Sequence, residues 1–378
     1  MRKLAPKDLE PGMISAKVVT TPLGQVLANE GDEITRPLIN RMKLYKVDYA
    51  WVRGEAPLPE IAPKTPVITS NNTVKNVSSA KTHAQESKTH SQKVAASPEF
   101  RDFQMGYFVA IDKLKEVFAS AEKGEQINTT ALLYSVSDLF RQRNTIIELF
   151  DMLFNMRIVE DSIYAHCLNV GLISRMIGRW LKLGSEELNV LTLSGLLHDI
   201  GKIKIPKEIL NKPDKLTDEE FNLIRQHPQF GFDILKEQKL NSHIKKAALM
   251  HHERYDGSGY PNHLAKDSID NYAMIVGIAD VYDAMTATRA YRAPLCPFQV
   301  ISNFEQEGYQ KYNTKYILTF LKQIAATYQN NRVILSDGRG CNIVMLNPNA
   351  LSKPMVQLDD NSVIDLSTEK DIYIKSVL

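Results

Sequence analysis

Five histidines and two aspartates in the middle of the chain have the types and spacing of a metal centre. They are His166, the pair His198 and Asp199, His227, the pair His251 and His252, and Asp280. Imidazole nitrogen combined with carboxylate oxygen suits first-row transition metals, whereas magnesium and calcium sites use oxygen alone. Because a carboxylate can bridge two ions through its two oxygens, Asp199 would let seven ligands hold two metals about 3.5 to 4 Å apart. That spacing is used for phosphodiester hydrolysis, so the residues predict a dinuclear hydrolytic site.

Taken singly, these residues have more ordinary explanations. A lone histidine on an apolar helix, such as His166, is more often a hydrogen-bonded core residue than a ligand. His227 alone would indicate a helix end, since histidine interacts favourably with the C-terminal end of the helix dipole. Adjacent His-Asp and His-His pairs in one segment, with Asp280 flanked by apolar residues, favour the joint explanation as a metal site. His243 and His263 fit no part of this pattern and are expected on the solvated surface.

The segments that must position these ligands are predicted to be helical, so the expected fold class is mainly α. From Glu99 onward apolar residues recur at helical spacing. Residues 99–157 are expected to form amphipathic helices that lead into an all-helical domain over residues 158–328. Within that domain Thr217, with Glu220 three residues later, is a capping box that predicts a helix start.

Two small β modules and a linker are expected around the helical part. Residues 1–55 show short apolar bursts broken by turn pairs, which predicts a small, mostly β module. Residues 56–98 are too polar to bury enough surface to offset the entropy of ordering, which predicts a disordered linker. After Tyr328 apolar residues alternate, so residues 329–378 are expected to form a C-terminal β appendage.

The composition of the chain excludes several classes of protein. A net charge of only +2 over 378 residues gives no global field that would select a nucleic-acid polymer. The three cysteines are widely spaced and odd in number, which indicates a reducing compartment and no disulfide framework. The chain starts without a secretory signal and has no apolar stretch long enough to cross a bilayer. We therefore expect a cytoplasmic protein without a membrane segment.

Four motifs, in this order, resemble the HD-GYP subgroup of the HD phosphohydrolases. They are Leu-Leu-His-Asp-Ile-Gly-Lys from Leu196, then His227, then His-His-Glu-Arg-Tyr-Asp-Gly-Ser-Gly-Tyr-Pro from His251, then Ala-Asp-Val-Tyr-Asp-Ala-Met-Thr-Ala-Thr-Arg-Ala-Tyr-Arg from Ala279. The start of the chain is similar to the small module that often precedes such domains. The resemblance implies a bacterial enzyme that opens a cyclic dinucleotide.

The resemblance also implies a ligand set for each of two divalent ions. One ion would be held by His166, His198, Asp199 and Asp280, and the other by Asp199, His227, His251 and His252. A hydroxide between the ions would attack phosphorus in line with the leaving 3′ oxygen. Iron or manganese is favoured, with nickel or zinc as alternatives. Some relatives place a glutamate one helical turn before the first histidine to help hold a third ion, but this chain has Ser162 there, so we predict two ions.

Residues outside the ligand set also correspond to functional positions of the family. Lys202 resembles the phosphate-contacting lysine, with a solvated surface lysine as the alternative. Asp283, one helical turn after Asp280, would orient the water or accept its proton, or would fix a ligand histidine. Arg289 and Arg292 correspond to basic positions that hold phosphates or guanine. The guanidinium group of arginine can bind either of them through two parallel hydrogen bonds.

The loop that names the subgroup, residues 257–261, carries Tyr260. Its glycines allow a tight turn that would place the Tyr260 ring where a base could stack on it. In the family this loop is also implicated in contacts with diguanylate cyclases.

The expected function is hydrolysis of cyclic di-GMP to linear pGpG, with further cleavage to GMP left open. The alternative substrate is 3′,3′-cyclic GMP-AMP, because metal ligands contact only phosphate. A non-catalytic cyclic-dinucleotide sensor or scaffold is a second alternative, although no ligand for two metals is missing. A broader HD-type activity on nucleoside phosphates is a further rival, against which the Gly-Tyr-Pro segment argues. The native metal, the role of the N-terminal module and a homodimer through the helices around Phe103 to Leu153 stay open.

Overall fold

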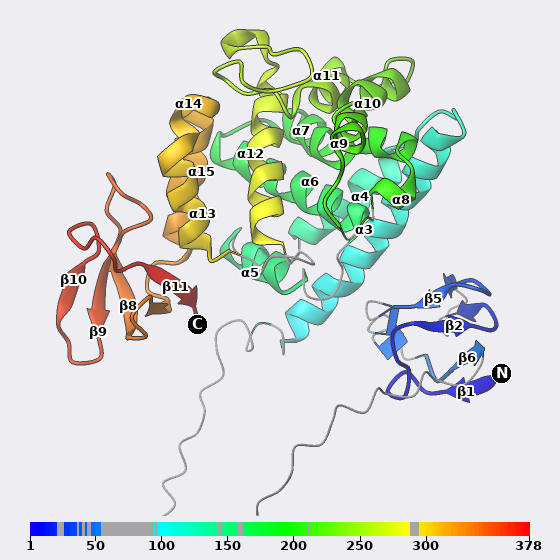
Figure 1. Cartoon of the computed structure of the whole chain (residues 1–378), viewed down its shortest axis with the longest axis horizontal. Coiled ribbons are helices and arrows are strands. Elements are labelled where there is room, and N and C mark those ends of the chain that lie inside the picture. The colour runs from blue at the N-terminus through cyan, green and yellow to red at the C-terminus, as the bar shows by residue number, and fades with distance from the viewer. Residues whose placement is uncertain are drawn as a thin grey trace, which may run out of the picture. The chain divides into compact units, whose positions relative to one another are not determined.

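The structure, a computed structural model, describes most of the chain. The described residues are 1–20, 26–35, 38–39, 42–43, 47–53, 94, 97–141, 146–156, 162–210, 212, 214–287 and 295–378. They belong to two compact units, Met1–Lys88 and Thr89–Leu378 (Figure 1). Within the described ranges, no helix combines the length and the apolar character needed to cross a membrane. The linker predicted over residues 56–98 lies almost entirely outside these ranges.

The first unit is made of short antiparallel strands. They are β1 (Arg2–Leu4), β2 (Met13–Ser15), β3 (Val19–Thr20), β4 (Val26–Ala28), β5 (Glu33–Ile34) and β6 (Ala50–Arg53). The main sheet has the order β1-β6-β2-β5, and β3 pairs with β4 in a second sheet. Because successive side chains of a strand point to opposite faces, Met13 and Ser15 are buried while Ile14 between them is exposed.

The second unit is mostly helical. Its α-helices are α3 (Pro98–Glu122), α4 (Thr130–Arg141), α5 (Ile146–Met156), α6 (Ile163–Trp180), α7 (Ser185–Leu197), α8 (Lys207–Leu210), α9 (Asp218–Ile224), α10 (His227–Leu235), α11 (Ser242–Met250), α12 (Asn271–Thr286), α13 (Pro297–Asn303), α14 (Tyr309–Lys311) and α15 (Thr314–Thr327). Three further short helices are η1 (Ile200–Lys204), η2 (Lys266–Ser268) and the π-helix η3 (Phe304–Gly308). The predicted mainly α fold class is confirmed.

Helix α6 lies in the middle of this unit and packs against α3, α7, α12 and α15 (Figure 1). Its approach to α7 depends on two glycines, because a Cβ on Gly195 would lie 2.7 Å from the Cα of Gly171. Only residues without side chains allow backbones this close. The close packing sets the start of α6 beside the end of α7, and each of these ends carries predicted ligands.

The helix start predicted at Thr217 is confirmed. The Thr217 hydroxyl accepts a hydrogen bond from the Glu220 backbone N–H at 3.2 Å, and the Glu220 carboxylate accepts one from the Thr217 N–H at 2.7 Å. This reciprocal pair satisfies two backbone donors that a helix leaves open at its first turn. Helix α9 therefore begins where the sequence pattern placed it.

A five-stranded antiparallel sheet follows the last helix. Its strands are β7 (Arg332–Leu335), β8 (Gly340–Met345), β9 (Met355–Leu358), β10 (Val363–Asp365) and β11 (Ile374–Val377), in the order β10-β9-β8-β7-β11. The last strand, β11, begins at Ile374. The preceding carbonyls of Asp371 and Tyr373 accept hydrogen bonds from the hydroxyl and the backbone N–H of Ser336, in the turn after β7.

Candidate metal centre

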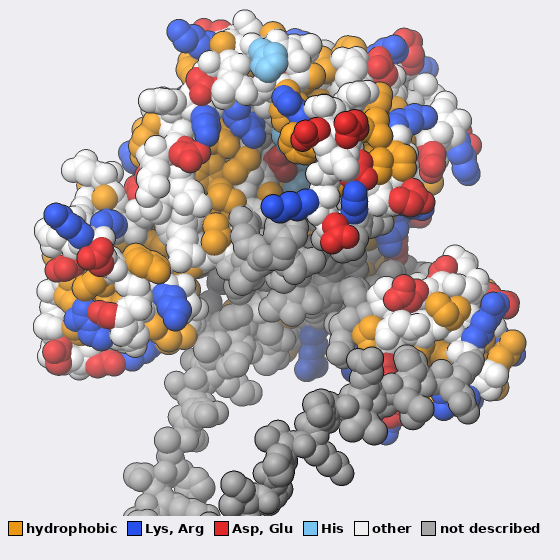
Figure 2. All heavy atoms as spheres, in the orientation of Figure 1, with side chains coloured by type: hydrophobic (Ala, Val, Ile, Leu, Met, Phe, Trp, Pro, Cys, Tyr) orange, Lys and Arg blue, Asp and Glu red, His pale blue; other side chains and the backbone are white. Residues whose placement is uncertain are grey.

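The structure brings all seven predicted ligands together at helix ends. His166 comes from the first turn of α6, His198 and Asp199 follow α7, His227 begins α10, His251 and His252 follow α11, and Asp280 lies in α12. His227 starts α10, and its Nδ1 atom also contacts the carbonyl of Ile224, the last residue of α9, so the contact with a helix C-terminus expected for this residue alone is present as well. Histidine side chains are visible at the bottom of a hollow in the surface of the second unit (Figure 2).

Asp199 lies between two groups of histidines and presents one oxygen to each. Its Oδ2 is 3.4 Å from His198 Nε2 and 3.6 Å from His166 Nε2. Its Oδ1 is 3.1 Å from His227 Nε2 and 3.8 Å from His251 Nε2. The carboxylate is almost fully buried. A carboxylate that bridges two cations presents its two oxygens in this way.

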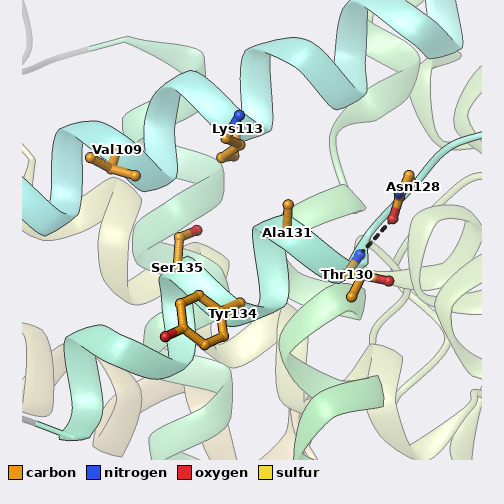
Figure 3. Close-up of a pocket in the computed structure, with 7 residues that line it drawn as sticks. All are labelled: Val109, Lys113, Asn128, Thr130, Ala131, Tyr134 and Ser135. Carbon is orange, nitrogen blue, oxygen red and sulfur yellow. Dashed lines mark hydrogen bonds between the residues drawn. The ribbon is translucent and has the colours of Figure 1, made fainter.

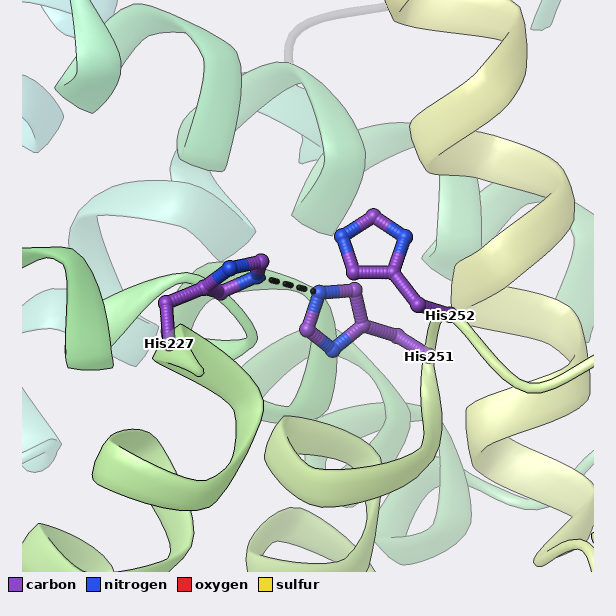
Figure 4. Close-up of side chains that lie close together, drawn as sticks. All are labelled: His227, His251 and His252. Atoms are coloured by element: carbon purple, nitrogen blue, oxygen red, sulfur yellow. Dashed lines mark hydrogen bonds between the residues drawn. The ribbon is translucent and has the colours of Figure 1, made fainter. Parts of the chain in front are cut away.

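Potential ligand atoms on each side of Asp199 lie within 4.8 Å of one another. One group contains His166, His198 and Asp280, and the other contains His227, His251 and His252. In the first group Asp280 Oδ1 is 3.1 Å from His166 Nε2. In the second group the three rings converge from α10 and from the end of α11 (Figure 4). The two groups coincide with the two ligand sets expected from the sequence, apart from Asp199, which faces both.

Hydrogen bonds on the outer side of the rings orient three of the histidines. The Nδ1 atom of His198 is 2.7 Å from the Gly195 carbonyl, that of His227 is 2.7 Å from the Ile224 carbonyl, and that of His251 is 3.0 Å from the Ala248 carbonyl. A carbonyl oxygen can only accept, so in each ring Nδ1 carries the hydrogen and donates it. In the neutral ring Nε2 is then a lone-pair donor, and it points toward Asp199.

Burial and charge keep most of the centre in a form that can bind metal. Burial and the neighbouring His252 hold the pKa of His251 well below its usual value, and burial lowers the pKa of His252 to about 3. Burial raises the pKa of Asp199, but Lys202 and His198 outweigh it and the pKa falls well below the usual value. His166 differs: burial lowers its pKa, yet hydrogen bonds to Asp280 and Asp283 raise it to about 10. An ion would have to displace that proton.

Two features of the centre are unfavourable without a cation. Among the described residues, His198 Nε2 and Asp199 Oδ1 are buried atoms with no hydrogen-bond partner. In addition, the Nε2 atoms of His227 and His251 lie 3.1 Å apart (Figure 4). With the hydrogen of each ring on Nδ1, each of these Nε2 atoms carries a lone pair. Buried polar atoms are normally satisfied, and facing lone pairs repel. Divalent cations on both sides of Asp199 would resolve both problems, so the donor set fits two metal ions.

The outer hydrogen bond of His166 belongs to a buried polar chain that the sequence did not indicate. The carboxylate of Asp283 accepts from His166 Nδ1 at 2.8 Å and from Asn169 Nδ2 at 3.0 Å. Tyr107 on α3 donates to Asn169 Oδ1 at 2.7 Å. Asn169 lies one helical turn after His166, so a buried polar residue at that spacing was the available signal. Of the two roles expected for Asp283, the contact favours fixing a ligand histidine.

We expect Asp283→Asn to weaken metal binding about tenfold to a hundredfold, the range found for such outer contacts. One carboxylate oxygen would become an NH₂ group facing either His166 Nδ1 or the donor of Asn169, so one of the two hydrogen bonds is lost. Metal retention against a chelator measures this. Asp270→Asn is the matched control, because Asp270 holds His243 Nδ1 at 2.8 Å outside the centre. Equal retention in both variants would contradict the role of Asp283.

The remaining predicted site residues have different surroundings. Lys202 Nζ is 2.5 Å from Asp199 Oδ2, so its charge offsets that of the central carboxylate. The Tyr260 ring stacks on the His252 ring, with centroids 4.5 Å apart and planes 25° apart. Arg289 and Arg292 lie outside the described residues. His243 is 40% exposed in its side chain, as expected for a surface residue.

The loop that carries Tyr260 is attached to the ligand segment by a buried carboxylate. Glu253, which follows His252, accepts hydrogen bonds from the backbone N–H of Asn262 at 2.7 Å and of Leu264 at 3.0 Å. A Cβ on Gly259 would lie 2.4 Å from the Arg254 nitrogen, so this position requires glycine. These contacts hold the loop against the backbone of His252. Sequence reasoning missed Glu253, because its partners lie in the loop and not at helical spacing.

Cys167 is a second residue that the sequence analysis set aside. It is fully buried, and its sulfur lies within 4.8 Å of ligand atoms of His198 and Asp199. Burial, and then the negative charge of Asp199, hold the pKa of the thiol well above its usual value. A protonated thiol is a poor metal ligand, so Cys167 is better described as packing beside the centre.

Comparison with known proteins agrees with this geometry. A family model described as an HD domain matches residues 132–315. Residues 132–315 of the chain therefore match an HD domain. This HD domain contains the predicted ligand positions between α6 and α12, and the mainly helical fold is the one that the motifs predicted.

Curated relatives of the chain are named as phosphodiesterases. "Cyclic di-GMP phosphodiesterase PA4108" of Pseudomonas aeruginosa is 34% identical over 53% of this chain and 49% of its own length. The "response regulator RpfG" of Xanthomonas campestris pv. campestris, also named a cyclic di-GMP phosphodiesterase, is 42% identical over 32% of each chain. A "3'3'-cGAMP-specific phosphodiesterase 2" of Vibrio cholerae is 38% identical over 36% of this chain and 26% of its own. The chain thus spans about half or less of the length of these relatives.

A solved structure has a fold similar to that of the chain. The structure titled Bd1817, a "HDG"Y"P protein" from Bdellovibrio bacteriovorus, covers 84% of this chain and 97% of its own, with a TM-score of 0.50 and 15% identity. At this identity the match shows the fold alone. It agrees with the mainly helical fold that the motifs predicted.

Proposed function

We propose that the chain is a metal-dependent phosphodiesterase that hydrolyses cyclic di-GMP to linear pGpG. The observation that carries the proposal is the position of Asp199, whose two oxygens face two separate histidine groups. Two cations about 3.5 to 4 Å apart can bind both the attacking and the leaving oxygen of a phosphodiester. The names of the relatives from Pseudomonas and Xanthomonas support cyclic di-GMP as the substrate.

The residues of the chain have distinct parts in this proposal. His166, His198, Asp199 and Asp280 would hold one ion, and Asp199, His227, His251 and His252 the other, with iron or manganese favoured over nickel or zinc. When bound, the ions would supply Lewis acidity and an activated water. Asp283 holds the ring of His166 in place, and the backbone carbonyls do the same for His198, His227 and His251. Lys202, held by Asp199, is placed to share its positive charge with a bound phosphate.

The alternative substrate, 3′,3′-cyclic GMP-AMP, is supported by the relatives from Vibrio cholerae whose names specify it. Both cyclic dinucleotides present the same phosphodiester to the metal ligands, so purine choice depends on other side chains. Turnover of each compound by metal-loaded protein, with linear products resolved chromatographically, separates the two. We expect faster cleavage of cyclic di-GMP. Cleavage of neither compound would refute the enzyme proposal and leave the sensor or scaffold alternative, which binds without turnover.

We expect two metal ions per chain in protein purified without oxygen. The position one turn before His166 is Ser162, whose hydroxyl accepts a hydrogen bond from the Ala165 backbone N–H at 3.2 Å as the N-cap of α6. Serine there supplies a helix cap and no carboxylate, so a third ion lacks this ligand. Elemental analysis measures the count, and three ions per chain would contradict the expectation.

The predicted partners and location of the chain stay predictions. A cavity of about 500 Å³ opens between α3 and α4 (Figure 3), lined by Val109, Lys113, Asn128, Thr130, Ala131, Tyr134 and Ser135. It lies on the helices for which the sequence left a homodimer contact open, and Tyr134 is 65% exposed. We infer from the motifs a bacterial, cytoplasmic enzyme whose Gly-Tyr-Pro loop also contacts diguanylate cyclases. Size-exclusion chromatography with light scattering, and a pull-down with a purified cyclase, test these two associations.

A further inference from the structure

Arg225 is a partly buried cation beside the metal centre that no motif singled out. It caps the C-terminal end of α9, two residues before the ligand His227. Its guanidinium carbon lies 4.6 Å from the centroid of the Tyr260 ring, and that ring stacks on the ligand His252. Phe221, one helical turn earlier, provides a second ring at 6.0 Å. The guanidinium therefore contacts the ring of Tyr260, and that ring contacts the predicted metal ligand His252.

The donors of Arg225 are uncommitted, unlike those of two neighbouring cations. Among the residues that the structure describes, no carboxylate pairs with Arg225 and no acceptor binds its guanidinium N–H groups. Lys202, by contrast, is paired with Asp199 at 2.5 Å. Arg254 donates to the backbone carbonyls of His251 and Glu253 at 3.1 and 3.0 Å. A contact with an aromatic face uses the charge of a cation and consumes no N–H donor, so the hydrogen-bonding capacity of Arg225 is open for a ligand.

We propose that Arg225 binds the second, non-scissile phosphate of a cyclic dinucleotide. The inference rests on the proposed function, which places the scissile phosphate at the metal centre. Both phosphates of a cyclic dinucleotide belong to one small macrocycle, so the second anion must lie close to the first. A guanidinium fork matches the geometry of a phosphate better than an ammonium group does. The Tyr260 ring preorganises the arginine, which reduces the entropy lost when the phosphate binds.

Binding a non-reacting phosphate has a defined kinetic signature. The contact is the same in the ground state and the transition state, so its loss raises KM and leaves kcat nearly constant. The loss of a hydrogen bond to a charged group corresponds to about a tenfold or larger change in affinity. For a substrate with only one phosphate, loss of the contact should raise KM much less.

The test compares Arg225→Ala and Arg225→Lys with Arg101→Ala, which removes an exposed arginine of α3 outside the centre. Each metal-loaded protein is assayed on cyclic di-GMP and on bis(p-nitrophenyl) phosphate, a diester with a single phosphate. For Arg225→Ala we expect KM for cyclic di-GMP to rise about tenfold or more with kcat within about twofold. KM for cyclic di-GMP should therefore rise about tenfold more than KM for bis(p-nitrophenyl) phosphate. Arg225→Lys should lie between Arg225→Ala and wild type, and Arg101→Ala should match wild type.

Several results would overturn the inference. One is an equal rise in KM on both substrates, and another is a loss confined to kcat. A third is Arg225→Ala kinetics that match those of Arg101→Ala. In each case cyclic di-GMP is still cleaved by wild-type protein, so the proposed function survives. If wild-type protein cleaves bis(p-nitrophenyl) phosphate and neither cyclic dinucleotide, the proposed function itself fails, and this inference fails with it.

Discussion

Replacing Asp199 with alanine is expected to lower kcat on cyclic di-GMP by at least about a thousandfold, as removal of a central member of a catalytic unit does. Both groups of histidines face this carboxylate, one through each oxygen, at 3.1 to 3.8 Å. Without it neither ion has a full ligand set, and the two positive charges lose the anion between them. The purified variant should therefore also hold far less metal than wild type, which elemental analysis measures.

The control for this experiment is Asp233→Ala. Asp233 is a half-exposed aspartate on α10 that pairs with Lys236 at 3.0 Å, away from the predicted ligands. An exposed pair of this kind contributes little to stability, so turnover and metal content should match wild type. If Asp199→Ala retains both ions and more than about a tenth of the activity, then Asp199 does not bridge the centre.

The second large effect is expected from Gly201→Ala. A Cβ on Gly201 would lie 2.0 Å from the His227 carbonyl oxygen and 2.4 Å from the Gly231 nitrogen. Both are backbone atoms of α10, so no side-chain rotation relieves the collision. Helix α10 would have to move away from η1, which would separate His227 from Asp199. We expect the free energy of unfolding to fall by roughly 3 kcal/mol or more, at the upper end of overpacking effects.

Urea denaturation of the metal-free protein measures this loss without a contribution from bound ions. Gly184→Ala is the matched control, because Gly184 has φ −67° and its added Cβ would meet only Glu187 Oε2 at 3.4 Å. That change should cost less than about 1 kcal/mol. A Gly201→Ala protein with the stability of Gly184→Ala would show that η1 and α10 do not depend on this close approach.

That these seven side chains come together could be predicted from the sequence, because they belong to local, ordered motifs. His198 with Asp199 and His251 with His252 are adjacent pairs, and the helix ends that carry them follow from apolar periodicity. The start of α9 was predictable for a similar reason, since a capping box is a contact between residues three positions apart.

Contacts between distant segments could not be predicted in this way. Tyr107 reaches Asn169 across 62 positions, and Arg225 meets Tyr260 only after α9 and the loop have packed together. Neither pair has a spacing that marks it in one sequence. The Tyr260 ring was expected to stack on a base, and in the structure it contacts His252 and Arg225. Tertiary packing determines such contacts, and the periodicity of a local sequence does not predict them.

The position of two ions on either side of Asp199 is the claim that the other conclusions depend on. Anomalous diffraction from crystals loaded with manganese locates such ions directly. We predict two peaks, one among His166, His198 and Asp280 and one among His227, His251 and His252, with the Asp199 carboxylate between them. A single peak, or ions bound elsewhere with the histidine groups empty, would contradict the account.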